Sequence, residues 1–478
     1  MCGIFGYCGN RNDAAEVVFE GLKRLEYRGY DSWGIATQVK SQSFDKLRMT
    51  LSKSKGQSGK PKIVIEKHVG KISAGKLRNL KSNLALGHTR WATHGGVTVA
   101  NAHPHLDCPG EIAVVHNGII ENYQELKKKL TSAGHRFKSE TDTETVVHLV
   151  EEYAKNKPFA EAVRSAFLDV SGLNAFVFLS ADGQMVAVKS GTPLVIGLGK
   201  GENFICSDPS ALLPHTRKAT FLVDNEVVEL TANKVRIIDA RTKKEIKPKI
   251  TNLNWKLEEI DLGSFAHFML KEIYEQPRVL RTIAANGRQI RELARVVRNA
   301  HGTFFIGCGT ASYAALSGAY LFSKVAKKHV NFSIGSEFNY LEDYLNEKSL
   351  VVAVSQSGET IDVVEPAVRA KSKRAKVVAL TNVEGSSLYR LADYKVLLNA
   401  GPERAVCATK SFCAMVANLI YLTYAVVDKD KEGKEILEIA SNAVEEILAP
   451  DYISKIKKLA RELKKSHDIY IIGRGISY

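Results

Sequence analysis

The chain has 478 residues, of which 45% are hydrophobic and 25% are charged, as expected for a globular protein with two or three domains. Its formal net charge is +15, and two segments, residues 41–62 and 241–256, each carry six basic residues and one acidic residue. Neither segment shows the interleaved basic and aromatic pattern of a nucleic-acid-binding surface, so the charge favours anionic metabolites as partners.

The cysteines and the hydropathy pattern indicate the compartment. The seven cysteines are scattered and include no Cys-x-x-Cys pair, which argues against a disulfide framework or a structural zinc site. No apolar run has the length that crosses a bilayer, and the first residues lack the basic and apolar blocks of a secretion signal. We therefore expect a cytoplasmic protein without a membrane or nucleic-acid partner.

Residues 1–240 are predicted to form the first domain. Short apolar runs and helical periodicity predict strands and helices at residues 113–115, 175–179, 185–188, 122–133 and 143–154. Residues 41–62 are rich in Ser, Lys, Gln and Gly, which predicts a mobile insertion between two strands.

Residues 241–284 are predicted to be a linker and a connecting helix, which covers residues 258–275 and ends near Pro277. Residues 285–445 then alternate between helices and strands, which predicts a doubly wound parallel sheet. The strand candidates are residues 303–306, 330–334, 350–354, 376–380 and 395–398, and a long helix is predicted at residues 410–427.

The C-terminal segment repeats a pattern from this second domain. Residues 305–309, Phe-Ile-Gly-Cys-Gly, are echoed about one domain length later by residues 471–475, Ile-Ile-Gly-Arg-Gly. A strand that leads into a Gly-x-Gly turn begins another unit of the same kind. Residues 455–478 are therefore predicted to start a second, incomplete domain, in a truncated chain.

The most distinctive position is Cys2. Removal of Met1, which a small second residue permits, leaves a cysteine with a free α-amino group. This amine has an ordinary pKa of about 7.7–8.0, so it can accept a proton near neutral pH. A thiol beside its own base is the activated nucleophile of N-terminal nucleophile enzymes. The alternative is an inert cysteine buried in a first strand.

Three further motifs place polar groups at the ends of predicted elements. Residues 87–95 form a Gly-bounded loop in which Arg90 can pair with a carboxylate. Asn117 and Gly118 follow a strand and offer an amide and a backbone N–H to a developing oxyanion. Residues 139–144 place carboxylates ahead of a helix, where N-capping is the alternative role.

Together these motifs resemble the glutaminase domain of the class II glutamine amidotransferases. The resemblance is carried by residues 2–4, 27–32, 87–95, 101–105, 116–118 and 141–143, in this order. It implies an N-terminal nucleophile fold, a four-layer αββα sandwich. It also implies that Cys2 attacks the glutamine amide carbon with its own amine as general base, and that Asn117 and Gly118 hold the oxyanion.

The same resemblance implies how glutamine is held. Arg90 would bind the α-carboxylate and Asp142 the α-ammonium, because a zwitterion needs one cation and one anion. The loop that closes over glutamine would include Trp91, Thr93 and His94.

Several histidines in this region raise the question of a metal site; they are His88, His94, His103 and His105. No cysteine or carboxylate accompanies them at ligand spacing, which favours loop hydrogen bonding as their role. We expect no metal and no cofactor.

The second domain contains a candidate phosphate site. Residues 354–360, Val-Ser-Gln-Ser-Gly-Glu-Thr, lie between a predicted strand and a predicted helix, so hydroxyls, an amide and backbone N–H groups converge at a helix N-terminus. Residues 307–310 offer a second such turn. Neither matches a nucleotide P-loop or a dinucleotide fingerprint.

With residues 265–273, 276–277 and 408–412, these turns resemble the flavodoxin-like sugar isomerase (SIS) domain of the glucosamine-6-phosphate synthase family. The resemblance implies sugar-phosphate ligands at Thr310, Ser355, Gln356, Ser357, Thr360 and Val406. The family often has serine directly after the Gly-Thr turn, whereas this chain has Ala311 and then Ser312.

The resemblance implies a homodimeric enzyme that converts L-glutamine and D-fructose 6-phosphate into L-glutamate and D-glucosamine 6-phosphate, with part of the isomerase site missing from this chain. One alternative is a glutaminase with another acceptor, such as phosphoribosyl diphosphate, for which the sequence lacks an acidic pair followed by a Thr-rich loop. The other alternative is a non-catalytic protein that only binds a sugar phosphate.

Overall fold

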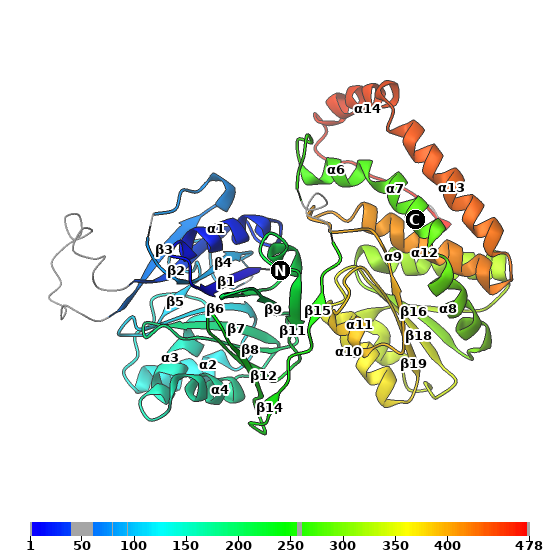
Figure 1. Ribbon diagram of the computed structural model, residues 1–478. Coiled ribbons are helices and arrows are strands. Elements are labelled where there is room, and N and C mark those ends of the chain that lie inside the picture. The colour runs from blue at the N-terminus through cyan, green and yellow to red at the C-terminus, as the bar shows by residue number, and fades with distance from the viewer. Residues whose placement is uncertain (1, 40–60, 79, 93, 256–260, 476–478) are drawn as a thin grey trace. The chain divides into compact units, whose positions relative to one another are not determined.

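The computed structural model describes residues 2–39, 61–78, 80–92, 94–255 and 261–475. The chain divides into two compact units, Met1–Leu257 and Glu258–Tyr478 (Figure 1). The predicted insertion at residues 41–62 lies almost entirely outside the described residues, and only its last two positions are described.

The first unit contains two antiparallel sheets. The eight-stranded sheet has the order β15-β11-β9-β10-β1-β4-β2-β3, and the seven-stranded sheet has the order β14-β13-β12-β8-β7-β6-β5. The strands of the first sheet are β1 (Gly3–Gly9), β2 (Ser32–Val39), β3 (Lys62–Val69), β4 (Leu84–Arg90), β9 (Val195–Leu198), β10 (Glu202–Cys206), β11 (Lys218–Phe221) and β15 (Thr251–Asn252). Those of the second are β5 (His105–Leu106), β6 (Ile112–Gly118), β7 (Asn174–Ser180), β8 (Met185–Ser190), β12 (Glu226–Leu230), β13 (Val235–Asp239) and β14 (Glu245–Ile246).

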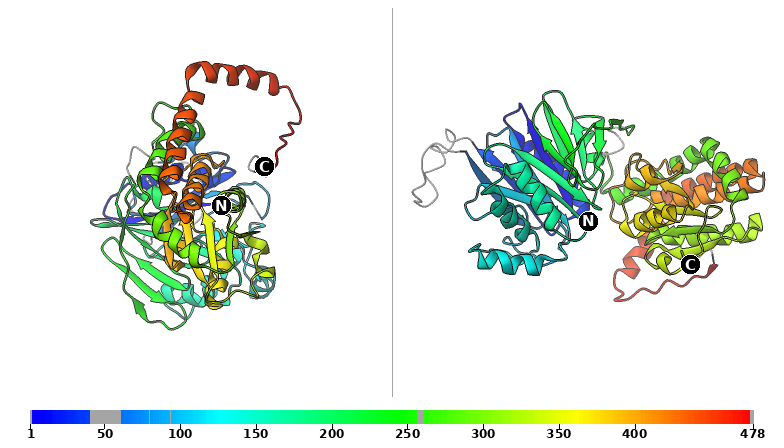
Figure 2. Two further views of the ribbon diagram at one scale, coloured as in Figure 1. Left: turned by 90° about the vertical axis from the view of Figure 1, so that its right-hand side faces the viewer. Right: turned by 90° about the horizontal axis from the view of Figure 1, so that it is seen from below.

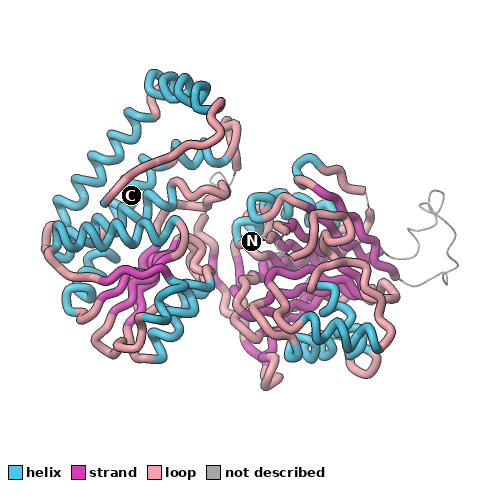
Figure 3. Tube along the Cα trace, turned by 180° about the vertical axis from the view of Figure 1, so that it is seen from behind, coloured by secondary structure: helices cyan, strands magenta, loops and turns pink. Residues whose placement is uncertain are grey.

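The two sheets pack face to face, with helices on their outer faces (Figures 1 and 3). The helices are α1 (Ala14–Arg24) on the eight-stranded sheet, and α2 (Tyr123–Ser132), α3 (Thr143–Ala154) and α4 (Phe159–Asp169) on the seven-stranded sheet. Side chains alternate along β7: Val177 packs between the sheets, while Phe176 and Phe178 pack under the helices. This arrangement is the predicted αββα sandwich.

The second unit contains a parallel five-stranded sheet of order β17-β16-β18-β19-β20, with helices on both faces. The strands are β16 (Thr303–Gly307), β17 (Asn331–Ile334), β18 (Leu350–Ser355), β19 (Lys376–Thr381) and β20 (Tyr394–Leu397). The helices on one face are α7 (Gln276–Ala285), α8 (Arg288–Asn299), α9 (Thr310–Leu321), α12 (Lys410–Val426) and α13 (Asp430–Ile447), and those on the other are α10 (Ile361–Ser372) and α11 (Ser387–Leu391). The predicted alternation and parallel sheet are confirmed.

The predicted linker at residues 241–284 is partly wrong. β14 and β15 lie within it and pair with strands of the first unit, since a chain of any sequence can satisfy backbone groups at a sheet edge. The predicted helix at residues 258–275 is shorter in the structure, as α6 (Phe268–Tyr274), and His267 caps it by accepting a hydrogen bond from the Leu270 N–H. Pro277 then lies in the first turn of α7, where its missing N–H costs nothing.

The C-terminal repeat does not form a strand in the part of the chain that the structure describes. The chain forms α14 (Pro450–Leu463), which projects from the end of α13, and then continues without regular pairing (Figure 2). Ile471 and Ile472 are each 94% exposed. Among the described residues, this segment pairs with no strand of the five-stranded sheet.

No helix among the described residues combines the length and the apolar character needed to cross a membrane.

Replacing Phe178 by alanine tests the outer core of the first unit. Phe178 is 1% exposed and contacts the layer beneath α3 and α4, so we expect Phe178→Ala to lower the free energy of unfolding by about 3–5 kcal/mol. All three tryptophans of the chain lie in this unit, so guanidinium unfolding followed by tryptophan fluorescence reports on it. Leu168→Ala, at a 44% exposed position, is the control and should change stability by less than about 0.5 kcal/mol. Equal effects of the two variants would contradict this assignment of the core.

Candidate active site

Cys2 lies where the central strand of the eight-stranded sheet begins. β1 pairs with β4, and Gly3 is opposite Thr89, so Cys2 lies beside the end of β4. The Trp91 N–H donates a hydrogen bond to the Cys2 Sγ at 3.3 Å. A Cβ on Gly3 would lie 2.5 Å from the Thr89 Oγ1, so only glycine allows the two strands to approach this closely.

Burial sets the state of the Cys2 thiol. It raises the pKa of Cys2 above the ordinary thiol value, and the Trp91 N–H and the Arg90 charge offset this only in part. The thiol therefore does not ionise by itself near neutral pH. A nucleophilic role for Cys2 requires a base that removes its proton.

Asn117 connects the second sheet to Cys2. It lies near the end of β6, and its Nδ2 donates a hydrogen bond to the Cys2 carbonyl oxygen at 3.0 Å. The His88 Nε2 lies 3.0 Å from the Asn117 Oδ1 and 3.1 Å from the His116 carbonyl oxygen. Since both partners are acceptors, the His88 Nε2 carries the proton, and the Asn117 amide is held with its NH₂ group toward Cys2.

His88 stays neutral. Its burial lowers its pKa to about 3, and its ring stacks on the His103 ring with 4.3 Å between centroids. His103 Nδ1 accepts a hydrogen bond from the His116 N–H at 3.3 Å, and His105 Nε2 lies 3.1 Å from the Thr141 Oγ1. These histidines make the hydrogen bonds that the sequence analysis favoured for them.

Gly118, the last residue of β6, has a backbone conformation that other residues do not readily adopt. Its φ is 136°, and a Cβ at this position would lie 2.2 Å from the Leu173 carbonyl oxygen. Glycine therefore allows β6 to end with its backbone close to the start of β7.

Arg90 is buried at the end of β4, and its guanidinium is surrounded by the loop that follows. It donates hydrogen bonds to the carbonyl oxygens of His94, Gly95 (3.2 Å) and Gly96 (3.1 Å). Burial lowers its pKa, while Cys2, Asp31 and Asp142 act in the opposite direction. The sequence predicted a carboxylate partner for Arg90, and the structure shows its donors directed at backbone carbonyls.

Asn101 and Glu140, which the sequence analysis did not select as site residues, hold the loop that follows Arg90. The Asn101 Nδ2 donates to the Gly96 carbonyl oxygen at 3.0 Å and to the Glu140 Oε2 at 2.9 Å. The Glu140 Oε2 also accepts the Gly96 N–H at 3.3 Å. Glu140 was visible in the sequence as one of the carboxylates ahead of α3. Its contact with Gly96 could not be predicted, because the two residues are far apart in the sequence.

The other predicted glutamine ligands lie around this loop. Asp142 is buried at the start of α3, and its Oδ2 accepts the Ile120 N–H at 2.8 Å. The Trp91 ring contacts the Tyr30 ring edge to face, and the His94 ring contacts Tyr123 in the same way. Thr93 lies outside the described residues. Cys2, Asn117 and Arg90 are thus brought together, while the structure adds His88, Asp31, Asn101 and Glu140 to the predicted set.

The candidate sugar-phosphate residues lie at the carboxyl edge of the parallel sheet. Thr310 begins α9 directly after β16, and Ser355 to Thr360 connect β18 to α10. Because β16 and β18 are neighbours, both turns meet at the same edge. The Ser355 Oγ accepts the Gly358 N–H at 3.0 Å and lies 3.1 Å from the Thr360 Oγ1.

The remaining residues of this candidate site are Gln356, Ser357 and Val406. The Gln356 carbonyl oxygen accepts the Asn382 N–H at 3.0 Å, and the Ser357 Oγ accepts the Glu359 N–H at 3.1 Å. Val406 is 62% exposed on the loop between β20 and α12.

Ser312 lies in the first turn of α9, two positions after Thr310. Its Oγ donates to the Gly309 carbonyl oxygen at 2.7 Å, within the first turn of its own helix, and Ala311 is buried beside it.

The sequence analysis missed Glu272 in this unit. Burial is the main reason that the pKa of Glu272 is raised to about 7. Its carboxylate accepts hydrogen bonds from the N–H groups of Arg404 (2.6 Å) and Ala405 (3.1 Å), which act in the opposite direction. It holds the loop that carries Val406, which no local pattern around Glu272 could indicate.

Comparison with known proteins defines the class. A glutamine amidotransferase domain model matches residues 67–254, and a SIS domain model matches residues 297–425. The chain thus combines a glutamine amidotransferase domain with a sugar isomerase type of domain.

Relatives identify the family. The glutamine–fructose-6-phosphate aminotransferases (isomerizing) of Thermococcus kodakarensis and Thermus thermophilus are each 41% identical to this chain, over 488 and 493 residues, which is 100% of this chain and 78% of each relative. The chain belongs to the glutamine–fructose-6-phosphate aminotransferase (isomerizing) family. Among solved structures, it is similar to the C-terminal domain of glucosamine-fructose-6-phosphate aminotransferase from Francisella tularensis, with 25% identity and a TM-score of 0.40 over 45% of this chain and 64% of that one.

Gly118→Ala tests the constraint at the end of β6. We expect it to lower the free energy of unfolding by about 2–5 kcal/mol, because positive φ and a backbone collision both penalise the added methyl group. Gly183→Ala is the matched control: its φ is also positive, at 90°, but its added Cβ meets only the Gln38 Nε2, at 3.6 Å. The control should lose about 1–2 kcal/mol in the same denaturant titration. A Gly118→Ala variant as stable as the control would contradict the collision.

Proposed function

We propose that this protein hydrolyses L-glutamine in its first unit and uses the ammonia in its second unit to convert D-fructose 6-phosphate into D-glucosamine 6-phosphate. The observation that carries the proposal is the contact between Cys2, at the start of β1, and the amide of Asn117 on the other sheet. The names of relatives at 41% identity over the whole chain support the choice of acceptor.

The first step is the attack of Cys2 on the carboxamide carbon. After removal of Met1, the free amine of Cys2 takes the thiol proton, which the raised pKa of the thiol makes necessary. One N–H of the Asn117 amide already donates to Cys2, which leaves the second N–H and the Gly118 N–H to bind the oxyanion. The protonated amine then delivers its proton to the leaving ammonia. Water hydrolyses the thioester to glutamate and regenerates the thiol.

Arg90 and Asp142 are proposed to bind the charged groups of glutamine. A carboxylate is a stronger acceptor for a guanidinium than the neutral carbonyls that now surround Arg90, so substrate would replace part of these contacts. Movement of the Arg90 loop would then carry Trp91, Thr93 and His94 over the substrate. The ties from Asn101 and Glu140 to Gly96 limit that movement to the segment before Gly96.

In the second unit, the phosphate is proposed to bind where β16 and β18 end. The N-termini of α9 and α10 supply backbone N–H groups and a favourable dipole. The proposed ligands are Thr310, Ser355, Gln356, Ser357, Thr360 and Val406. Hydroxyl and amide ligands suit a small molecule that must also leave, because they add no fixed charge to the site.

We also propose a cytoplasmic homodimer. All seven cysteines are free, which supports a reducing compartment, and the dimer rests on the family resemblance. Sedimentation velocity of the purified chain tests the oligomeric state, and a monomer at micromolar concentration would contradict it.

Replacing Cys2 tests the nucleophile. Cys2→Ala keeps a small second residue, so Met1 removal is preserved, and we expect glutamate release to fall by about 10⁴-fold or more. Cys413→Ser, on α12 of the second unit, removes a thiol far along the chain and should retain the wild-type rate. Intact-mass spectrometry of the active protein should show that Met1 is absent. Glutamate release by Cys2→Ala at the wild-type rate, or activity with Met1 attached, would exclude this mechanism.

A double-mutant cycle tests how Asn117 is positioned. We expect Asn117→Ala to lower kcat for glutamine hydrolysis by about 10²–10³-fold, the effect of one lost oxyanion donor. His88→Ala should lower kcat by up to about 10²-fold, because it leaves the Asn117 amide free to rotate. Since His88 acts through Asn117, the double variant should be no slower than Asn117→Ala alone. Multiplicative effects on kcat would show that the two residues act independently.

A further inference from the structure

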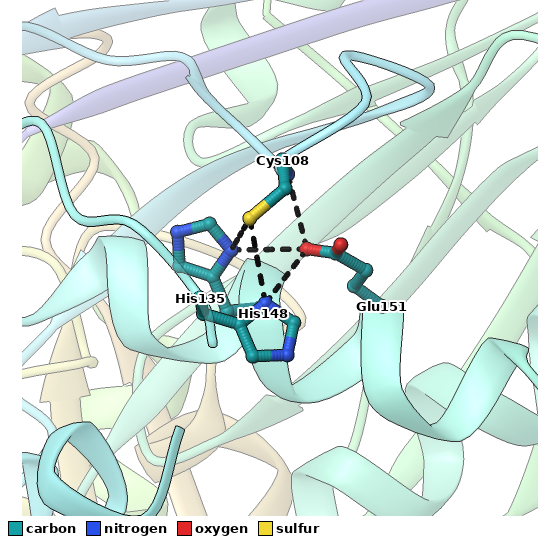
Figure 4. A group of neighbouring side chains, drawn as sticks. All are labelled: Cys108, His135, His148 and Glu151. Atoms are coloured by element: carbon teal, nitrogen blue, oxygen red, sulfur yellow. Dashed lines mark hydrogen bonds and ion pairs between the residues drawn. The ribbon is translucent and has the colours of Figure 1, made fainter. Parts of the chain in front are cut away.

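Four side chains with metal-binding atoms converge at the helical side of the seven-stranded sheet (Figure 4). Cys108 lies in the turn between β5 and β6, and His135 follows α2. His148 and Glu151 are three residues apart on α3, so they lie on the same face of that helix. None of the four belongs to the candidate active site described above.

The donor atoms of this cluster lie close together. The Cys108 Sγ is 3.5 Å from the His135 Nδ1 and 3.7 Å from the His148 Nδ1. The Glu151 Oε2 is 3.0 Å from the His135 Nδ1 and 3.1 Å from the His148 Nδ1. All four atoms lie within 4.8 Å of one another.

The four distances from sulfur and oxygen to the two nitrogens are close to four of the six edges of a tetrahedral zinc site. With Zn–S of about 2.3 Å and Zn–N and Zn–O of about 2.0–2.1 Å, tetrahedral angles give edges of about 3.6 Å between sulfur and nitrogen and about 3.3 Å between nitrogen and oxygen. The observed edges to Cys108 match the first value, and those to Glu151 are 0.2–0.3 Å shorter than the second. A small outward movement of the Glu151 carboxylate is enough to admit the ion.

Carboxylates outside the cluster face both histidine rings, at hydrogen-bond distance for His135 and at ion-pair distance for His148. The His135 Nε2 lies 2.6 Å from the Glu152 Oε1, and the His148 Nε2 lies 3.7 Å from the Glu144 Oε1. Each ring thus directs Nδ1 into the cluster and Nε2 toward a carboxylate outside it. This is the usual arrangement of metal-bound histidines, in which the outer carboxylate fixes the tautomer and increases the basicity of the ligand nitrogen.

Several contacts of the cluster converge on one carboxylate oxygen. The Glu151 Oε2 is the common partner of the two Nδ1 atoms and of the Cys108 N–H, at 3.0 Å. The Cys108 Sγ faces the same two nitrogens, and sulfur is only a weak hydrogen-bond partner. Sulfur, two nitrogens and an oxygen directed at one point form a ligand set of the kind that zinc prefers.

The geometry points to a structural zinc site formed by the Cys108 thiolate, the Nδ1 atoms of His135 and His148, and the Glu151 carboxylate. Four protein ligands leave no open position for substrate, so the ion stabilises the fold and takes no part in catalysis. Binding releases to solvent the thiol proton of Cys108 and the protons that the two Nδ1 atoms donate to Glu151. This inference departs from the sequence-based expectation that the chain holds no metal and no structural zinc site.

The ion would join three segments that are far apart in sequence: the β5–β6 turn, the end of α2, and α3. One route leads from it to the candidate active site. Glu144, beyond His148, accepts the N–H groups of Lys138 (2.7 Å) and Ser139 (2.6 Å), in the loop that continues to Asp142. Zinc would therefore rigidify the loop that carries Asp142, a consequence that does not depend on the proposed function.

Metal analysis of the full chain tests the site. The protein is purified without a histidine tag, incubated with Zn²⁺ and desalted. We expect inductively coupled plasma mass spectrometry to find about one zinc ion per chain. Co²⁺ in place of zinc should give the visible bands of tetrahedral cobalt and a thiolate-to-cobalt charge-transfer band. Chelator should lower the melting temperature of the wild-type protein, because zinc binds the folded state.

Variants separate this site from adventitious binding. Cys108→Ser, in an exposed turn, and His148→Gln should each hold less than about a tenth of the wild-type zinc, and chelator should no longer change their melting temperatures. Circular dichroism checks that each variant is folded, and Cys413→Ser is the matched control that should keep the metal. Absence of zinc from the loaded wild-type chain, retention of zinc by folded Cys108→Ser, or a cobalt spectrum without the thiolate band would overturn the proposal.

Discussion

The hydrogen bond between the Asn117 amide and the Cys2 carbonyl is the contact on which the site depends. It joins the end of a strand in one sheet to the start of a strand in the other. Its direction depends on His88, which must remain neutral with its proton on Nε2 to hold the Asn117 oxygen. Burial ensures this by lowering the pKa of His88 to about 3. The interior of the sandwich therefore acts on the site through desolvation.

Histidines in the first unit fall into two electrostatic environments. Those near Cys2 face hydroxyls, amides and backbone groups, and burial lowers their pKa values, as for His88 and His116. His148 faces two carboxylates, Glu144 at 3.7 Å and Glu151 at 3.1 Å, and although burial acts to lower its pKa, these carboxylates raise it overall. Neutral imidazoles orient an amide in the first environment. In the second environment, the carboxylates favour a positive charge at the cluster.

In the second unit, the strand order determines where the candidate sugar-phosphate residues lie. Parallel strands end at one edge, so the turns after β16 and β18 meet although they are separated by a helix and a strand. Glu272, on helix α6, fixes the loop after β20 by accepting hydrogen bonds from the N–H groups of Arg404 and Ala405. A single buried carboxylate thus connects the start of this unit to the loop that carries Val406.

Much of the architecture could be predicted from the sequence, because its signals are local. A short apolar run marked β7, and the rhythm of strands and helices marked the parallel sheet. The candidate nucleophile Cys2 and the candidate oxyanion donor Asn117 were selected from residue type and spacing. At residues 241–257 prediction failed, since pairing of β14 and β15 depends on sheet edges elsewhere in the fold.

The sequence by itself determined the order of the elements, the class of fold and the chemistry available at Cys2, because periodicity and residue type act over a few neighbouring positions. Only the tertiary structure decided what surrounds Arg90, which group orients Asn117, and that Cys108 lies beside His135 and His148, 27 and 40 residues away. Such separations exceed any local ligand motif. They become contacts because the packing of α3 against the sheet brings the helix, the end of α2 and the β5–β6 turn together.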